Sequence, residues 1–256
     1  MLVDLYQIIM KKFGLIGRTL SHSFSKNYFG EKFEKENITD AQYDLYELAD
    51  SKELLSLIEN NKGLLKGLNV TIPYKQDVLP FLKEIDPAAK KIGAVNVLKI
   101  ADNGDIKGYN SDYYGFKTSL ENFANEALND CKALILGTGG ASKAVKQALI
   151  DLNIPYQYVS RHRADGIISY DDLTPELIKA HKLIINCTPL GMHPNIDNCP
   201  YIPYKALSKE HLLYDLVYNP EETLFMKKGR EKGAKAIHGL EMLKLQAEKS
   251  WEIWNE

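Results

Sequence analysis

The chain has 256 residues, of which 45% are hydrophobic and 26% are charged. This balance is that of an ordinary globular protein with one or two domains, and it excludes a disordered chain or a fibrous repeat. The formal net charge of −2 gives no electrostatic reason to expect binding to nucleic acid or to an anionic membrane surface. A small molecule is therefore the favoured partner.

Three cysteines, Cys131, Cys187 and Cys199, are spread through the second half of the chain. They are too few and too scattered for a disulfide framework or a tetrahedral metal site. We therefore expect a cytoplasmic protein that holds no metal.

The N-terminal stretch 2–10 is mildly apolar, but it carries an acid and lacks both a basic leader and a small-residue cleavage site. We interpret it as a tail, or as sequence upstream of a start at Met10. No run of the chain approaches the roughly 20 apolar residues that span a bilayer. The sequence thus predicts no membrane-embedded segment.

Short apolar runs alternate with helix-period segments from residue 12 onward, which is typical of α/β architecture. The first half predicts, in order, a strand at 13–16, a helix at 24–36, a strand at 43–48, a helix at 51–58 and a strand at 68–72. Two further strands, 94–100 and 106–109, flank Asp102-Asn103-Gly104, which suits a tight hairpin turn. We expect these two strands to pair antiparallel.

The second half begins with a helical segment after Tyr114 and then a continuous apolar run at 132–136, typical of a strand buried on both faces. Apolar residues at helical spacing predict a helix at 141–152 and another from Leu240 to Trp254. Later strands are expected at 156–160, 183–187 and 212–217. This order predicts a parallel, doubly wound sheet.

The loop between the strand at 132–136 and the helix at 141–152 is rich in glycine: Gly137-Thr138-Gly139-Gly140-Ala141-Ser142. Gly137 permits a tight turn. Gly139 allows the backbone to approach a pyrophosphate at the helix N-terminus, where free N–H groups and the helix dipole attract anions. Ser142 replaces the third glycine of the usual dinucleotide-binding pattern. A purely structural turn is the alternative, because glycine-rich turns are common.

Cations follow the next expected strand, about twenty residues after the glycine loop, where an NAD-binding fold usually offers an acid to the ribose hydroxyls. The residues there are Ser160, Arg161, His162 and Arg163. The two arginines are suited to a 2′-phosphate through charge-assisted hydrogen bonds, which favours NADP over NAD. The alternative is a solvated basic loop.

Polar groups also gather at the end of the expected strand 68–72, in Asn69-Val70-Thr71-Ile72-Pro73-Tyr74-Lys75. Open α/β sheets bind ligands at such positions, and Pro73 suits the first turn of a helix. Lys75 by itself is typical of a surface lysine, but a lysine partly desolvated in a cleft can transfer protons near neutral pH. Asp112 has helix capping as its alternative role. A Lys75–Asp112 pair would account for both residues.

Taken together, these motifs resemble those of the shikimate dehydrogenase family. The resemblance extends from about Phe13 to the C-terminal helix and rests on eight motifs in order: His22-Ser23-Phe24-Ser25, Asn69 to Lys75, Gly93-Ala94-Val95-Asn96, Gly108 to Asp112, Gly137 to Ser142, Ile185 to Met192, Tyr218-Asn219-Pro220, and Gly239 through Met242-Leu243 to Gln246-Ala247. It implies an enzyme that uses NADPH to reduce 3-dehydroshikimate reversibly to shikimate in aromatic amino-acid biosynthesis, by direct hydride transfer.

The resemblance also implies roles for individual residues. Lys75 would carry the proton for the substrate oxygen, and Asp112 would orient and polarise that oxygen. The expected substrate-binding residues are Ser23 and Ser25 for the carboxylate, Thr71, Asn96, Asp112 and Gln246 for the ring hydroxyls, and Tyr218, which closes on the substrate. The expected cofactor-binding residues are Gly137, Thr138, Gly139, Gly140, Ala141, Ser142, Ser160, Arg161, Arg163, Thr188, Leu216 and Gly239. The serine pair has helix capping as its alternative role.

The expected fold is an α/β protein of two domains separated by a cleft. Residues 1–113 form the substrate-binding and catalytic domain, with a mostly parallel sheet, and residues 114–236 form a Rossmann-like NADP-binding domain. The helix within 237–256 packs back on the substrate domain. We expect a monomer or a homodimer.

Some positions depart from the family pattern. Thr19 and Lys26 stand where proline is usual on either side of the serine motif. Beside Asp112, Ser111 replaces a threonine and Tyr113 a glycine, and Ser160 replaces the asparagine usual before the arginine. None of these changes removes a proposed catalytic group.

Three alternative functions stay open. The first is a dehydrogenase for both quinate and shikimate that uses NAD or NADP. The second is a dehydrogenase acting on a folate, which the serine motif disfavours. The third is a catalytically silent dinucleotide-binding module, which would have little reason to combine Lys75, Asp112 and Gln246.

Overall fold

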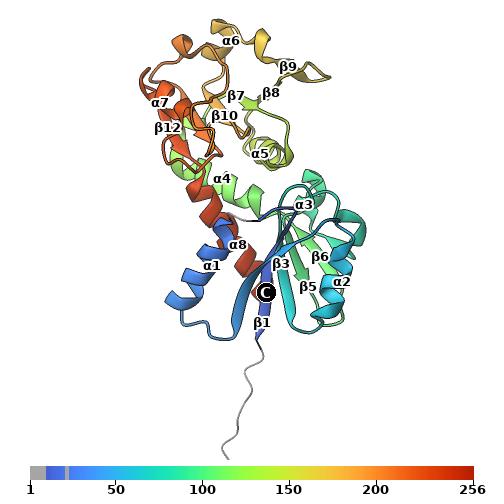
Figure 1. Ribbon diagram of the computed structural model, residues 1–256. Coiled ribbons are helices and arrows are strands. Elements are labelled where there is room, and N and C mark those ends of the chain that lie inside the picture. The colour runs from blue at the N-terminus through green and yellow to red at the C-terminus, as the bar shows by residue number, and fades with distance from the viewer. Residues whose placement is uncertain (1–9, 21–22) are drawn as a thin grey trace, which may run out of the picture. The chain divides into compact units, whose positions relative to one another are not determined.

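The computed structural model describes residues 10–20 and 23–256. The interpretation of 2–9 as a tail, and the expectation that His22 belongs to the serine motif, lie outside the described residues. The chain divides into two compact units, one of residues 1–111 and 247–256 and the other of residues 112–246. Figure 1 shows the elements of each unit along the chain.

The first unit contains a six-stranded sheet of order β2-β1-β3-β5-β6-β4. Its elements are β1 (Lys11–Gly17), α1 (Phe24–Lys35), β2 (Ala41–Glu47), α2 (Glu53–Asn60), β3 (Leu65–Val70), the 3₁₀ turn η1 (Leu79–Phe81), β4 (Glu84–Ile85), α3 (Pro87–Ile92), β5 (Val97–Ile100) and β6 (Ile106–Tyr109). Only β5 runs antiparallel to its neighbours, β3 and β6. The expected hairpin is confirmed, with Val97 opposite Tyr109 and Ile100 opposite Ile106.

Helices cover both faces of this sheet (Figure 1). Leu54 and Ile58 of α2 pack on one face, and Phe29 of α1 lies with Trp254 of the C-terminal helix on the other. Gly67 allows the closest approach, because a Cβ there would lie 2.2 Å from the Trp254 ring. The Trp254 indole N–H also donates to the carbonyl of Leu98 at 3.0 Å. The C-terminal part of the last helix, residues 247–255, is thus part of the core of the first unit.

The second unit contains a six-stranded, wholly parallel sheet of order β12-β11-β10-β7-β8-β9. Its elements are α4 (Ser111–Ala124), η2 (Asn125–Leu128), β7 (Ala133–Leu136), α5 (Gly140–Asp151), β8 (Tyr156–Ser160), β9 (Ile167–Ser169), η3 (Tyr170–Asp172), α6 (Pro175–Ala180), β10 (Leu183–Asn186), η4 (Tyr204–Ala206), β11 (Leu212–Asp215), α7 (Leu224–Arg230), β12 (Lys235–His238) and α8 (Leu240–Asn255). The unit boundaries fall within the first turn of α4 and in the middle of α8.

The second sheet is also covered on both faces. Phe116 of α4 and Val145 of α5 pack in the cluster on one side, and Ile178 of α6 and Phe225 of α7 pack in the cluster on the other. Strands β7, β10 and β11 are buried throughout. The expected doubly wound α/β fold is confirmed.

One local expectation was wrong, and one alternative role is not observed. Pro73 does not begin a helix: residues 72–78 form successive turns, and the N–H of Tyr74 donates to the carbonyl of Thr71 at 3.0 Å. Asp112 is not a helix cap, because α4 already begins at Ser111.

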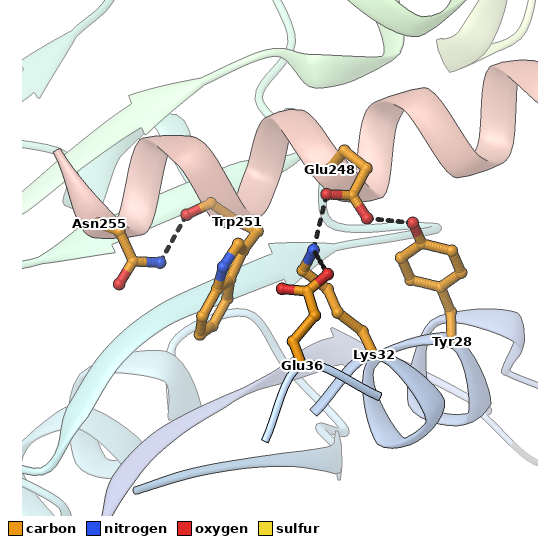
Figure 2. A network of polar contacts seen from close by, with 6 residues as sticks. All are labelled: Tyr28, Lys32, Glu36, Glu248, Trp251 and Asn255. Atoms are coloured by element: carbon orange, nitrogen blue, oxygen red, sulfur yellow. Dashed lines mark hydrogen bonds and ion pairs between the residues drawn. The ribbon is translucent and has the colours of Figure 1, made fainter. Parts of the chain in front are cut away.

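A polar network ties α1 to the C-terminal half of α8 (Figure 2). The Glu248 carboxylate accepts hydrogen bonds from the Tyr28 hydroxyl and, at 2.8 Å, from Lys32 Nζ, which also donates to Glu36 at 2.7 Å. The Lys32 side chain is only 8% exposed. Burial opposes ionisation of Glu248, but these hydrogen bonds and the Lys32 charge hold its pKa below the usual value.

Replacing Glu248 with glutamine is expected to lower the free energy of unfolding at neutral pH by about 1 kcal/mol, a modest value because the carboxylate is partly solvated. The folded-state pKa of Glu248 is lowered, so its stabilising effect is present above the unfolded pKa and is lost as the pH falls through the folded value. Urea unfolding of both proteins from pH 7 down to pH 3 would measure this. Glu252→Gln, which removes an exposed pair with Lys249 on the same helix, is the control, and a difference that is constant with pH would contradict the assignment.

Candidate active site

The order of the second sheet sets the position of its ligand site. Numbered along the unit, the strands lie in the order 6-5-4-1-2-3, so the topology reverses between β7 and β10. Ligands of such sheets bind at this reversal, beyond the carboxyl ends of the strands. The segments that leave β7 and β10 there begin at Gly137 and Cys187.

The glycine loop lies at this reversal and is built for a close backbone approach. Gly137 has φ of +100°, and a Cβ on it would lie 2.8 Å from Cγ2 of Thr188. At Gly139 and Gly140, by contrast, a Cβ would meet no atom within 4 Å. Gly139 is the N-cap of α5, and no side chain caps this helix. Among residues 10–20 and 23–256, therefore, no side chain caps the exposed N-terminus of α5 where an anion would approach.

Ser142 takes the place of the third glycine without blocking the loop. Its side chain is buried, and its hydroxyl donates to the carbonyl of Gly139 at 2.7 Å. The carbonyl of Ser142 in turn accepts a hydrogen bond from the Tyr158 hydroxyl at 3.0 Å. The Ser142 hydroxyl is thus bonded to the backbone of the loop. Thr138 and Ala141 remain at least partly exposed.

The other expected cofactor residues of this unit lie at the neighbouring strand ends. The N–H of Leu216 donates to the carbonyl of Asn186 at 3.0 Å, directly before the segment of Thr188. Gly239 packs so closely on Leu216 that a Cβ there would lie 2.3 Å from its carbonyl oxygen. The structure therefore brings Gly137, Thr188, Leu216 and Gly239 together at the carboxyl ends of the strands.

Ser160 ends β8, and the arginines after it differ in their surroundings. Arg163 donates to Asp172 through two guanidinium nitrogens, with Nε at 2.8 Å. Asp172 also caps the turn at Ser169, and the hydrogen bonds from Arg163 and Ser169 lower its pKa to about 2. Arg161 is exposed and makes no ion pair within residues 10–20 and 23–256. Of the two arginines, Arg161 is the one available to an added anion.

In the first unit, backbone hydrogen bonds bring Thr71, Lys75 and Asn96 together. The carbonyl of Lys75 accepts from the N–H of Val95 at 2.8 Å, and the carbonyl of Asn96 accepts from the N–H of Val70 at 2.9 Å. The buried Tyr74 between them donates its hydroxyl to the carbonyl of Leu48 at 2.5 Å. The turns after β3 are thus fixed to the start of β5, and the Lys75 side chain is half-buried.

A chain of buried side chains supports Asn96. Asn96 Oδ1 accepts from the N–H of Ser111 at 2.7 Å, and Ser111 Oγ lies 3.2 Å from Ser250 Oγ. Asn69 Nδ2 donates to Ser250 at 2.9 Å, and Asn69 Oδ1 accepts from the Tyr43 hydroxyl at 2.8 Å. Ser250 was not predicted from the sequence, although a small polar residue on the apolar side of the expected C-terminal helix was a signal for it.

The serine motif begins α1. Ser23 caps the helix by accepting from the N–H of Lys26 at 3.4 Å, which confirms the capping role. Ser25 is buried close to Tyr43, whose hydroxyl donates to Asn69 of the chain that includes Ser250. Both serines and Asn96 thus belong to one polar region of the first unit.

The remaining expected residues lie in the second unit. Asp112 occupies the first turn of α4, where a negative charge is favourable. Tyr218 follows β11, and burial raises its pKa. Gln246 is buried on α8 and donates to the carbonyl of Leu243 at 3.1 Å. The Lys75–Asp112 pair joins a residue of each unit and stays a prediction.

Residues 10–20 and 23–256 contain neither a candidate metal cluster nor a candidate membrane-spanning helix. No group of three His, Cys, Asp or Glu side chains in this part of the chain is placed to hold a metal ion. No helix within it is long and apolar enough to cross a lipid bilayer.

The parallel sheet, its reversal at β7 and β10 and the uncapped glycine loop together define an α/β protein of the dinucleotide-binding class. Comparison with known proteins narrows this class. The model of the shikimate dehydrogenase substrate binding domain matches residues 15–98. A protein of Clostridium beijerinckii named shikimate dehydrogenase (NADP(+)) is 43% identical, over 96% of this chain and 93% of its own.

Two solved structures match the chain over most of its length. A chorismate mutase/shikimate 5-dehydrogenase fusion protein from Clostridium acetobutylicum matches with a TM-score of 0.84 and 41% identity, over 96% of this chain and 91% of that chain. A quinate dehydrogenase from Corynebacterium glutamicum in complex with NAD matches with a TM-score of 0.85 and 27% identity, over 96% and 93%. The chain belongs to the shikimate dehydrogenase family.

Proposed function

We propose that the protein catalyses the reversible, NADPH-dependent reduction of 3-dehydroshikimate to shikimate. The observation that carries the proposal is the uncapped N-terminus of α5 at the sheet reversal, in a chain 43% identical to a relative named for this activity. The reaction makes the protein an oxidoreductase of aromatic amino-acid biosynthesis. We place it in the cytoplasm, which its free cysteines suit, as a monomer or homodimer.

The residues of the second unit fit NADP. The open space at Gly139 and Gly140 leaves room for a pyrophosphate against the free N–H groups of α5. We assign Arg161 to the 2′-phosphate, with Ser160 beside it. Because Arg163 already binds Asp172, its contact with the phosphate stays a prediction. Thr188, Leu216 and Gly239 line the half of the site beyond the reversal.

We assign substrate binding to the first unit, to two residues next to its boundary and to Tyr218 of the second unit. Ser23 and Ser25 lie at the start of α1 and are proposed to hold the substrate carboxylate. The proposed partners of the ring hydroxyls are Thr71, Asn96, Asp112 and Gln246, and Tyr218 is proposed to close on the ring. The buried support of Asn96 by Ser111 suits this role, since a fixed amide loses little entropy on binding.

In the proposed mechanism, Lys75 exchanges the proton of the substrate oxygen and Asp112 holds that oxygen in place. When bound, the reduced nicotinamide supplies the hydride for the carbonyl carbon. The protein positions the acceptor carbonyl and supplies charge where the oxygen becomes negative. The half-buried position of Lys75 after β3 is compatible with proton transfer by a lysine.

A spectrophotometric assay of shikimate-dependent NADP⁺ reduction tests the proposal. We expect turnover with shikimate and NADP⁺ at a kcat/KM of at least about 10⁴ M⁻¹ s⁻¹, typical of an enzyme acting on its own substrate. An absence of turnover, with NADP⁺ binding intact, would instead support a silent dinucleotide-binding module.

A dehydrogenase for quinate as well as shikimate, using NAD or NADP, is the second candidate. The similarity to the Corynebacterium glutamicum quinate dehydrogenase in complex with NAD favours it, whereas the exposed Arg161 favours NADP. Running the same assay with quinate and with NAD⁺ separates the two. We expect shikimate with NADP⁺ to be preferred, and an equal kcat/KM for quinate with NAD⁺ would establish the second candidate.

A further inference from the structure

Asp215, the last residue of β11, is a buried carboxylate with no role in the function proposed above. Its exposed fraction is 0%. Burial raises its pKa to about 6, although hydrogen bonds from Thr223, Val217 and Asn186 favour the charged form. Strongly perturbed acids in the interior of a protein are concentrated near functional sites. The contacts of Asp215 show what this one holds in place.

The first hydrogen bond of Asp215 connects it to Thr188 through Asn186. Asn186 Nδ2 donates to Asp215 Oδ1 at 2.9 Å. Asn186 Oδ1 faces the other way and accepts from the N–H of Thr188 at 3.0 Å and from its hydroxyl at 2.6 Å. Thr188 is the residue whose methyl group lies against Gly137. Asp215 is thus two hydrogen bonds away from the junction of β7 and β10.

The second hydrogen bond of Asp215 connects it to Leu216 and Gly239 through Val217. Asp215 Oδ1 accepts from the N–H of Val217 at 3.0 Å, which closes a turn around Leu216. The carbonyl of Val217 accepts from the N–H of Gly239 at 3.1 Å. One carboxylate therefore stabilises both segments that carry expected cofactor residues after β10 and β11.

The third contact fixes the carboxylate itself. Thr223 donates its hydroxyl to Asp215 Oδ2 at 2.6 Å and caps α7 by accepting from the N–H of Met226 at 3.3 Å. Both oxygens of Asp215 are therefore committed as acceptors. An ionised carboxylate offers no hydrogen to its neighbours.

This acceptor-only character determines how the Asn186 amide is oriented. A flipped amide would turn Oδ1 toward the Asp215 charge and Nδ2 toward the N–H of Thr188, so that like groups would face each other. With an amide at position 215, a flipped Asn186 Oδ1 can accept from the new amide nitrogen, so the repulsion from the carboxylate is lost and only the contacts with Thr188 favour the observed orientation. The negative charge thus strengthens the preference for the arrangement that accepts from Thr188.

We propose that Asp215 is a positioning residue that orders the nicotinamide-binding half of the dinucleotide site through Asn186–Thr188 and Val217–Gly239. The inference rests on the proposed function, because it assumes that NADP binds at the sheet reversal. In such folds each half of the sheet receives one mononucleotide. The glycine loop and Arg161 belong to the half of β7 to β9, so β10 to β12 receive the nicotinamide half.

Binding of two ligands to Asp215→Asn tests the proposal. NADP⁺ spans both halves, whereas adenosine 2′,5′-bisphosphate carries only the adenosine half with its 2′-phosphate. By calorimetry above the pKa of Asp215, we expect the dissociation constant for NADP⁺ to rise about tenfold or more, because small displacements at such sites have large effects. The constant for the bisphosphate is expected to stay within about twofold of the original protein.

Tyr214→Phe is the matched structural control. Tyr214 precedes Asp215 on the same strand and is fully buried. The substitution removes the hydrogen bond between its hydroxyl and Ser119, on the opposite face of the sheet. We expect it to lower the melting temperature without changing either dissociation constant. If Asp215→Asn does not yield folded protein, Asn186→Ala removes the link to Thr188 and is expected to show the same selective loss.

The outcomes separate this inference from the proposed function. An equal loss for both ligands, or no loss for either, would overturn the positioning role of Asp215. If the unsubstituted protein binds neither NADP⁺ nor the bisphosphate, the assignment of the cofactor site itself is wrong. A loss of NADP⁺ affinity alone supports the inference.

Discussion

Replacing Lys75 with alanine is expected to lower kcat by about 10²–10⁴-fold, the usual contribution of a general acid or base. The dissociation constant for NADP⁺ is expected to stay within about twofold, because the proposed cofactor site lies wholly in the second unit. The backbone at Lys75 is fixed to Val95, so the substitution removes the amine that exchanges the proton and leaves the turn that carries it in place. Steady-state kinetics with shikimate, together with NADP⁺ titration, would measure both effects.

Two further substitutions serve as controls, and the first of them separates proton transfer from charge. Lys75→Arg retains the positive charge but cannot release a proton near neutral pH, so its kcat is expected to remain low. Lys83→Ala removes an exposed lysine of the same unit that pairs with Asp105, and it is expected to leave kcat unchanged. Near-normal turnover of Lys75→Ala would refute the role assigned to this residue.

Replacing Arg161 with alanine is expected to raise the KM for NADPH by about 10–100-fold, which corresponds to loss of a charge-assisted hydrogen bond of about 1.5–3 kcal/mol. The KM for NADH is expected to change by less than about twofold, because NADH lacks the 2′-phosphate. The exposed Arg161 side chain makes no ion pair among the described residues that an added phosphate would have to break. Kinetics with both cofactors at saturating substrate would measure the ratio.

Arg163→Ala provides the comparison for this prediction. Its guanidinium is already neutralised by Asp172, so we expect a smaller loss of NADPH affinity than for Arg161→Ala. An equal loss for NADPH and NADH in Arg161→Ala would show that this arginine does not read the phosphate.

The central strands could be predicted from sequence because their residues are apolar throughout, as in β7, β10 and β11. Strands β9 and β12 were not predicted. Both lie at sheet edges, and β12 has only half-exposed and exposed residues. An edge strand has little apolar surface to bury, so its sequence carries no clear periodicity.

The glycine loop was predictable for a similar reason, because a strand, a turn and a helix follow one another along the chain. The role of Asp215 was not. Its partners Asn186 and Thr223 are 29 and 8 residues away in sequence, and their convergence depends on which strands become neighbours. A single acid within the otherwise apolar run 212–217 was the local signal.

The different surroundings of the two arginines likewise could not be predicted from the sequence. Arg161 and Arg163 are equivalent by composition and spacing, and only the turn at Ser169 places Asp172 beside one of them. Sequence can therefore indicate a basic site, while the fold determines which cation is left for a ligand.

The assignment of residues 247–256 to the first unit has a consequence for protein synthesis. The second unit is one continuous segment, so all of its residues leave the ribosome before Trp254 does. Until then the first sheet lacks the indole that covers Gly67, and its apolar face is incomplete. We therefore expect the dinucleotide-binding unit to fold first during translation, although it comes second in the chain.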